Sequence, residues 1–138
     1  MSGFLLDTHI WLWYAEGTPN KLSAASIRAL ESARRSAGLW VSAMSVWEIG
    51  MLQKRGRIQL SAPLRNWVEH ALQATGFRFL PLDAATAVES TLLPEPLHAD
   101  PADRFLIAAA RLMNLTIATC DAQILEYGRE GFVKTFAA

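Results

Sequence analysis

Short apolar runs alternate with longer segments of helical pattern along this chain, and this alternation limits the folds that it can adopt. Runs typical of strands lie at residues 4–6, 39–41, 77–82, 116–119 and 132–136. Helical patterns cover residues 23–35, 46–55, 64–74, 83–93 and 102–113. Strands that alternate with helices form parallel sheets with right-handed crossovers. The pattern therefore predicts an α/β fold, with a mainly parallel sheet of four to five short strands flanked by helices.

The size and composition of the chain fit a single domain over residues 1–138. Its 138 residues are 51% hydrophobic, which can bury a core without disulfides. Cys120 is the only cysteine, which excludes an internal disulfide and a cysteine-based zinc site and suits a reducing cytoplasm. We expect no membrane span and no signal peptide, because the apolar runs are too short. The 13 basic and 13 acidic residues balance, so nucleic-acid binding would depend on local patches.

Four acidic residues are expected at one edge of the predicted sheet. Asp7 directly follows the first strand, and Asp121 directly follows the fourth. Glu48 lies on the helix after the second strand, and Asp103 lies in the first turn of the apolar helix before the fourth. Ligands of parallel sheets gather at the carboxyl ends of the strands. These positions therefore predict a shared acidic site.

A group of carboxylates such as this one favours a divalent cation. Each ionised pair ~5 Å apart costs a few kcal/mol at intermediate dielectric, and a hard cation such as Mg²⁺ removes that cost. A cation held by carboxylates and water can bind phosphate oxygens and lower the pKa of a bound water. The sequence has no P-loop, G-x-G-x-x-G, H-E-x-x-H or G-x-S-x-G motif for competing chemistry. The acids therefore indicate hydrolysis of phosphodiester bonds.

Two of these acids also have a purely structural explanation when each is taken alone. Asp103 lies in the helix start 100–103, where Asp100 would be the N-cap and where the helix dipole favours an acid. Asp121 could cap a helix over residues 122–127. For these two positions the functional interpretation depends on the other acids.

The remaining two acids differ in how well local structure explains them. Ser45 and Glu48 match a capping box, whereas a helix that began at Ser42 would leave Glu48 in its interior. Asp7 is the hardest to explain, because Thr8 could meet any capping need at the end of the strand. The prediction of a site therefore rests on the four acids together.

The segments that carry the acids resemble the motifs of the PIN-domain ribonucleases. Residues 4–13, FLLDTHIWLW, resemble the opening of toxin-type PIN domains, and residues 41–49, VSAMSVWEI, resemble their second motif. Residues 98–110, HADPADRFLIAAA, resemble the H-x-D-P-F-D-R-L-L-I-A-x-A motif of one subgroup, with alanine in place of the aromatic residue. Residues 119–121, TCD, match the closing T-x-D. The segments occur in the family's order and span nearly the whole chain.

The resemblance implies a PIN-like three-layer fold and a specific activity. Such proteins are usually the toxin of a toxin–antitoxin pair of the VapC type, and they cleave RNA with Mg²⁺ or Mn²⁺. They usually form homodimers, and an antitoxin protein blocks the acidic pocket. By analogy the catalytic, metal-binding acids are Asp7, Glu48, Asp103 and Asp121. The supporting residues are Thr119, Asp100 and Thr8.

Basic residues that could contact RNA are few. Arg104 belongs to the subgroup motif and lies four residues after Asp100, so it could form a surface ion pair or contact the substrate. Lys54, Arg55 and Arg57 form the densest basic cluster. This cluster could hold the RNA backbone or simply favour the C-terminus of a helix.

The histidines and tryptophans allow several roles. His9 and His98 lie near the acids, but a lone histidine is more often a hydrogen-bond partner than a catalyst. Trp11, Trp13 and Tyr14 lie close to the predicted site and are candidates for contact with an antitoxin or a second subunit.

We therefore expect a metal-activated water to hydrolyse RNA and to leave 5′-phosphate and 3′-hydroxyl ends. Asp7, Asp103 and Asp121 would bind one or two ions, and Glu48 would bind a second ion or orient the water. A phosphatase of the haloacid dehalogenase type is a poor alternative, because it needs a D-x-D pair and position 9 is histidine. The other alternative is a PIN-like module that binds RNA or protein without cleavage.

Overall fold

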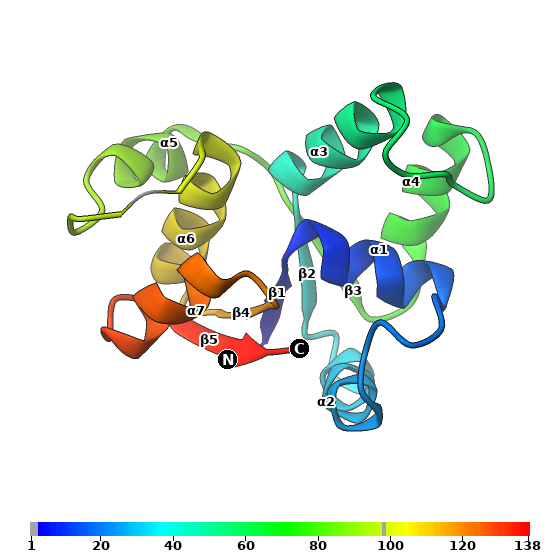
Figure 1. Ribbon diagram of the computed structural model, residues 1–138, viewed down its shortest axis with the longest axis horizontal. Coiled ribbons are helices and arrows are strands. Elements are labelled where there is room, and N and C mark those ends of the chain that lie inside the picture. Colours follow the sequence, from blue (N-terminus) through cyan, green and yellow to red (C-terminus); the bar gives the residue numbers. More distant parts are fainter. Residues whose placement is uncertain (1–2, 98) are drawn as a thin grey trace.

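The structure is a computed structural model that describes residues 3–97 and 99–138, so His98 lies outside the described residues. Its five-stranded sheet is parallel, in the order β3-β2-β1-β4-β5 (Figure 1). The strands are β1 (Phe4–Leu6), β2 (Leu39–Ser42), β3 (Phe77–Leu80), β4 (Thr116–Thr119) and β5 (Lys134–Ala137). The predicted fold class is confirmed. The last strand begins two residues later than predicted, since Phe132 packs against Tyr127 instead.

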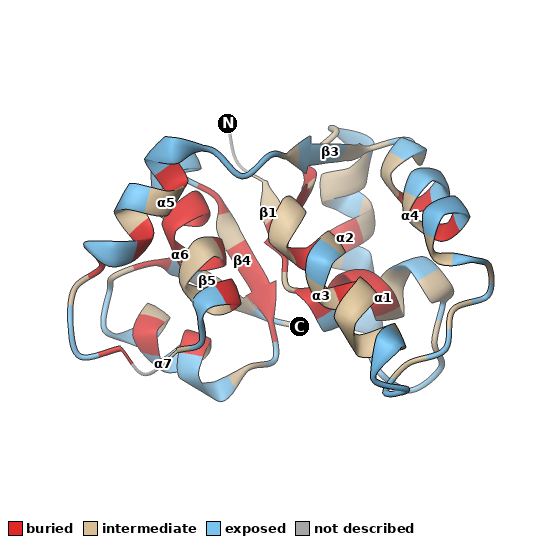
Figure 2. Ribbon diagram, turned by 90° about the horizontal axis from the view of Figure 1, so that it is seen from above, coloured by how far each residue is buried: buried red, intermediate tan, exposed pale blue. Residues whose placement is uncertain are grey.

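Helices cover both faces of the sheet, which confirms the three-layer arrangement. The helices are α1 (Thr8–Glu16), α2 (Ala24–Arg35), α3 (Ala43–Lys54), α4 (Leu64–Gln73), α5 (Ala84–Thr91), α6 (Pro101–Met113) and α7 (Ala122–Arg129). Helices α5, α6 and α7 lie on one face, and α1 to α4 lie on the other (Figures 1 and 2). None of the helices in the described part of the chain is long and apolar enough to cross a bilayer.

The central strand shows why its sequence is apolar throughout. Leu5 and Leu6 are both fully buried, but they point to opposite faces of the sheet. Leu5 packs in one core cluster with Leu106 of α6, and Leu6 packs in the other with Ile10 of α1. A strand that is covered on both faces needs apolar side chains at successive positions. This burial fixes β1 at the centre and places the residue that follows it at the edge of the sheet.

The sequence pattern predicts no helix directly after the first strand, but α1 begins there. Its residues Ile10 and Trp11 are consecutive and fully buried, so its apolar positions form no single stripe that a periodicity search would detect. Asp7 is the N-cap of α1, and its Oδ1 accepts the N–H of Thr8 at 2.8 Å. The prediction that Asp7 has no capping role is therefore wrong. So is the prediction that Trp11 contacts a partner, because its side chain lies in the core.

The starts of two other helices decide between alternatives left open by the sequence. Helix α3 begins at Ala43, because the Ser42 hydroxyl accepts the N–H of Met44 at 3.0 Å. Glu48 is therefore an interior residue of α3, and the capping box beginning at Ser45 is wrong. Asp121 caps α7 and does so in addition to its place at the end of β4.

Candidate functional site

The candidate site lies where the chain order of the sheet reverses. Strands β1 and β4 pair side by side at the centre, while β1 leads on to β2 on one side and β4 leads on to β5 on the other. Parallel sheets bind ligands at the carboxyl ends of the strands at such a switch point. Asp7 follows β1, and its N–H donates to the carbonyl of Ala118 in β4 at 3.0 Å. Asp7 and Asp121 thus lie at the ends of neighbouring strands.

Thr119 joins these two acids. It is fully buried at the end of β4, and its hydroxyl donates to Oδ2 of Asp7 at 2.6 Å, across 112 positions of sequence. The same oxygen accepts the N–H of Asp121 at 2.9 Å. A single hydroxyl therefore orients the Asp7 carboxylate and the backbone from which the Asp121 side chain projects.

Glu48 reaches the site from α3 and is held by α1. The Thr8 hydroxyl donates to Oε1 of Glu48, and the hydroxyl oxygen of Ser45 lies 3.1 Å from that of Thr8. Thr8 and Ser45 are both buried. The sequence suggests only a capping role for Ser45, although its position one turn before Glu48 places both side chains on one face of α3.

The pKa of Asp103 gives the clearest sign that the four acids lie close together. It lies in the first turn of α6, where Asp100 caps the helix by accepting the Asp103 N–H at 2.9 Å. Burial and the charges of neighbouring acids raise the pKa of Asp103 to about 8. The acids responsible, in decreasing order of effect, are Asp100, Asp7, Asp121 and Glu48. The structure therefore brings the four predicted acids into one electrostatic neighbourhood, together with Asp100.

Burial also raises the pKa of two other acids at the site. Desolvation is the largest cause for both Asp7 and Glu48, and each is partly offset by the threonine hydroxyl that donates to it. The charge of His9 lowers both pKa values, and its exposed ring lies 5.5 Å from that of Trp13. Carboxylates that are desolvated and crowded together gain most from a cation.

The donor set at this edge fits a hard divalent cation. None of the three ion pairs within residues 3–97 and 99–138 involves Asp7, Glu48, Asp103 or Asp121. In the same residues, no three acidic, histidine or cysteine side chains are placed to ligate one ion together directly. Mg²⁺ keeps several of its waters and typically contacts proteins through one or two carboxylates. Contacts through water from the remaining acids are therefore compatible with this arrangement.

The predicted basic residues are not all free to meet a substrate. Arg104 pairs with Glu95 at 2.9 Å rather than with Asp100, so the surface pair expected from their spacing is wrong. Lys54, Arg55 and Arg57 are exposed at the C-terminal end of α3, on the helix that carries Glu48. Their predicted contact with RNA remains a prediction.

Thr119→Val should disturb the site through one hydroxyl. Valine has nearly the same shape but leaves Oδ2 of Asp7 and the N–H of Asp121 without their partner, which we expect to cost about 1–3 kcal/mol of stability. Supporting groups of this kind typically contribute ~10-fold or more to metal affinity. We expect Mn²⁺ affinity, measured calorimetrically, to fall by about that factor. Thr116→Val, at the other end of the same strand, is the control, and equal losses in both variants would contradict this role.

Comparisons with known proteins identify the family to which this fold belongs. The family model of the PIN domain matches residues 4–130. The chain is 32% identical over 124 residues to Ribonuclease VapC22 of Mycobacterium tuberculosis, covering 90% of this chain and 91% of that protein. The fold resembles the crystal structure of FitAcB from Neisseria gonorrhoeae, with a TM-score of 0.66, 23% identity and coverage of 97% and 96%.

A second solved structure gives the same result. VapBC2 from Rickettsia felis, bound to a DNA fragment from their promoter, matches with a TM-score of 0.69, 14% identity and coverage of 99% and 98%. The family match covers most of the chain and includes Asp7, Glu48, Asp103 and Asp121. This chain therefore belongs to the PIN-domain family.

Proposed function

We propose that this chain is a metal-dependent endoribonuclease and the toxin of a toxin–antitoxin pair. The observation that carries the proposal is geometric: Asp7 and Asp121 lie at the ends of the neighbouring strands β1 and β4 and share the Thr119 hydroxyl. The charges of both acids contribute to the raised pKa of Asp103. The relationship to Ribonuclease VapC22 supports RNA as the substrate. Carboxylates predominate at this site, so hydrolysis there would use a water activated by a cation and would need no histidine or lysine base.

Each acid has a distinct place in the proposed mechanism. Asp7, Asp103 and Asp121 would hold Mg²⁺ or Mn²⁺, directly or through water. When bound, the cation supplies Lewis acidity toward phosphate oxygens and lowers the pKa of water at the site. Glu48, with Oε1 held by Thr8, would orient the attacking water or hold a second ion. The Thr119 hydroxyl would favour the ionised form of the Asp7 carboxylate and direct it toward the cation.

RNA would approach the acids along α3. Lys54 lies six residues after Glu48, which corresponds to about 9 Å along a helix. Together with Arg55 and Arg57 it would bind phosphates of the RNA backbone, since these three exposed cations are close in sequence. This contact would attract the substrate despite the net charge of zero.

The proposed partners follow from the relatives. The similarity to VapC22 and to the VapBC2 complex supports a cognate antitoxin protein. We further propose that the working form is a homodimer in the cytoplasm. A module that binds RNA without cutting it is the alternative. The two differ in whether RNA is cleaved when a divalent cation is supplied.

The test is cleavage of total RNA by the purified protein with Mg²⁺, with Mn²⁺ or with a chelator. We expect internal cuts only with a divalent cation, and 5′-phosphate and 3′-hydroxyl ends when the cut sites are mapped by adaptor ligation. Turnover of a small phosphomonoester should be absent. Ends carrying 2′,3′-cyclic phosphate, or RNA that is bound but intact under all conditions, would each count against the proposal.

A further inference from the structure

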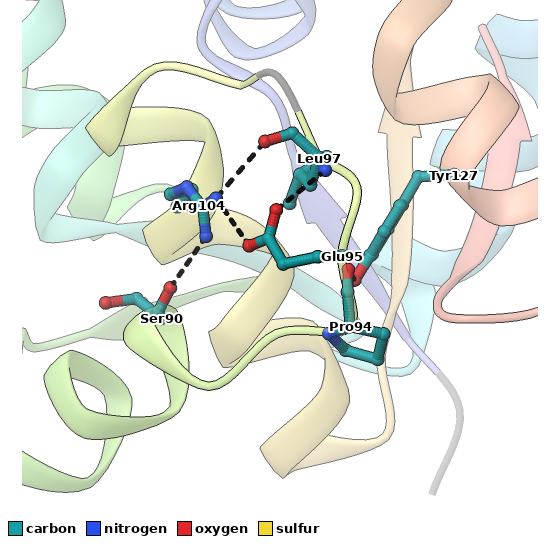
Figure 3. Close-up of polar contacts among 6 residues, drawn as sticks. All are labelled: Ser90, Pro94, Glu95, Leu97, Arg104 and Tyr127. Carbon is teal, nitrogen blue, oxygen red and sulfur yellow. Dashed lines mark hydrogen bonds and ion pairs between the residues drawn. The ribbon is translucent and has the colours of Figure 1, made fainter.

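The guanidinium of Arg104 is hydrogen-bonded to the end of α5 and to the loop between α5 and α6. Arg104 lies in α6, directly after Asp103, and its side chain is only 25% exposed. It donates to the carbonyl of Ser90 at 3.2 Å, to Oε1 of Glu95 at 2.9 Å and to the carbonyl of Leu97 at 3.1 Å (Figure 3). The Arg104 guanidinium therefore binds groups of the same chain, near the N-terminal end of α6, the helix that carries Asp103.

The loop between α5 and α6 is also held by hydrogen bonds of Glu95 and Tyr127. Oε2 of Glu95 accepts the N–H of Leu97 at 3.0 Å, so the carboxylate links Arg104 to the backbone of the loop (Figure 3). The Tyr127 hydroxyl of α7 donates to the carbonyl of Pro94 at 2.7 Å. Leu97 itself is buried in the core cluster formed with α6 and α7. Residues 94–97 are thus attached to α6 through Arg104 and to α7 through Tyr127.

This attachment has a direct consequence for the site. Three residues after Leu97, Asp100 caps α6 and accepts the N–H of Asp103. We propose that Arg104 is a positioning residue, which fixes the start of α6 and thereby directs the Asp103 carboxylate toward the other site acids. The inference rests on the proposed function only in that it takes Asp103 to bind a cation.

The chemistry of the contacts explains why arginine stands at this position. A planar guanidinium presents several N–H groups in a rigid fork and can meet two carbonyls and a carboxylate at once, whereas an ammonium is a compact point charge. Contact with an RNA phosphate would require Arg104 to give up bonds that it makes within the chain. The structure therefore favours a positioning role over the RNA contact that the sequence suggested.

Arg104→Ala tests the inference, with Arg111→Ala as a matched control. Arg111 lies on the same helix and is 30% exposed, and it likewise pairs with a glutamate, Glu89, and donates to a carbonyl, that of Phe132. Both variants should lower the melting temperature by similar amounts. Only Arg104→Ala should speed exchange of the Leu97 and Asp103 amides, by ~10-fold or more, and weaken Mn²⁺ binding by about 10-fold.

Kinetics separate positioning from RNA binding. We expect Arg104→Ala to lower kcat with KM for RNA unchanged, and Arg104→Lys to keep the charge without restoring Mn²⁺ affinity. If Arg104→Ala does not fold, Glu95→Gln should show the same effects in weaker form, since Glu95 is 61% exposed.

Two results would overturn the inference. One is unchanged amide exchange and Mn²⁺ affinity in Arg104→Ala, which would reduce Arg104 to a stabilising residue. The other is a raised KM with a shallower salt dependence and normal Mn²⁺ affinity, which would make it an RNA contact. If the wild-type protein binds no Mn²⁺, the proposed function fails, whereas the amide exchange still tests whether Arg104 fixes the start of α6.

Discussion

Asp103→Asn is expected to stabilise the metal-free protein at pH 8. Burial and the nearby acids raise the pKa of Asp103 from 3.8 to about 8. Between pH 3.8 and about pH 8 the folded protein therefore keeps a proton on Asp103 that the unfolded chain has lost. The free energy of unfolding falls as the pH rises through this range. Asparagine removes the charge at pH 8. Because the side chain is partly open to water, we expect the free energy of unfolding to rise by only about 1–3 kcal/mol.

The same substitution should nearly eliminate RNA cleavage. Loss of a carboxylate that holds the cation removes several kcal/mol of transition-state stabilisation, which corresponds to ~10³-fold or more in rate. Melting curves at pH 5 and pH 8 without metal should show a rise of about 5–10 °C at pH 8 and a smaller rise at pH 5, where only part of the penalty is present. Added Mn²⁺ should raise the melting temperature of the wild type but not of Asp103→Asn.

Asp83→Asn is the control for this charge removal. Asp83 is an exposed acid that caps α5, and the Thr86 N–H that donates to it lowers its pKa. Asparagine can accept the same capping bond, so this variant should show no gain at pH 8 and should cleave RNA normally. A loss of stability in Asp103→Asn at pH 8, or cleavage close to that of the wild type, would contradict the account.

The affinity for Mn²⁺ should rise steeply with pH. Because the pKa of Asp103 is about 8, the metal-free protein holds a proton that a binding cation must displace at lower pH. One displaced proton gives up to tenfold tighter binding per pH unit below the pKa, or ~50-fold between pH 6 and pH 8.

Calorimetric titration can count this proton directly. Titrations at pH 7 in two buffers of different ionisation enthalpy should show release of about one proton per Mn²⁺ in the wild type. A repeat with Asp83→Asn should give the same value, since Asp83 lies outside the site. Affinity that does not change between pH 6 and pH 8, with no proton released, would show that Asp103 is already ionised or takes no part.

Much of the site could be predicted because its acids follow apolar runs directly. A buried strand such as β1 is a continuous apolar run, and the first polar residue after it must lie at the edge of the sheet. Asp7 is such a residue, and Asp121 follows the end of β4 after a single residue. The cap at Asp100 and the proline after it likewise mark the start of α6 locally, and this places Asp103 in its first turn.

The remaining features depend on contacts between distant segments. No local pattern connects Thr119 with Asp7, or Thr8 with Glu48 at a separation of 40 positions. Helix α1 was not predicted because it is covered on both sides. Its sequence therefore lacks the apolar periodicity from which an amphipathic helix is predicted. Arg104 suggested a pair with Asp100 by its spacing, but the loop before α6 folds back and offers nearer acceptors.

Four acids from distant parts of the chain are proposed to form one cation site. The most direct measurement is anomalous X-ray scattering from a crystal of the wild-type protein grown with Mn²⁺. We expect a manganese peak at the carboxyl ends of β1 and β4, in contact with Asp7, Asp103 and Asp121 directly or through one water. A manganese peak located only elsewhere on the molecule, or none with the metal in excess, would contradict it.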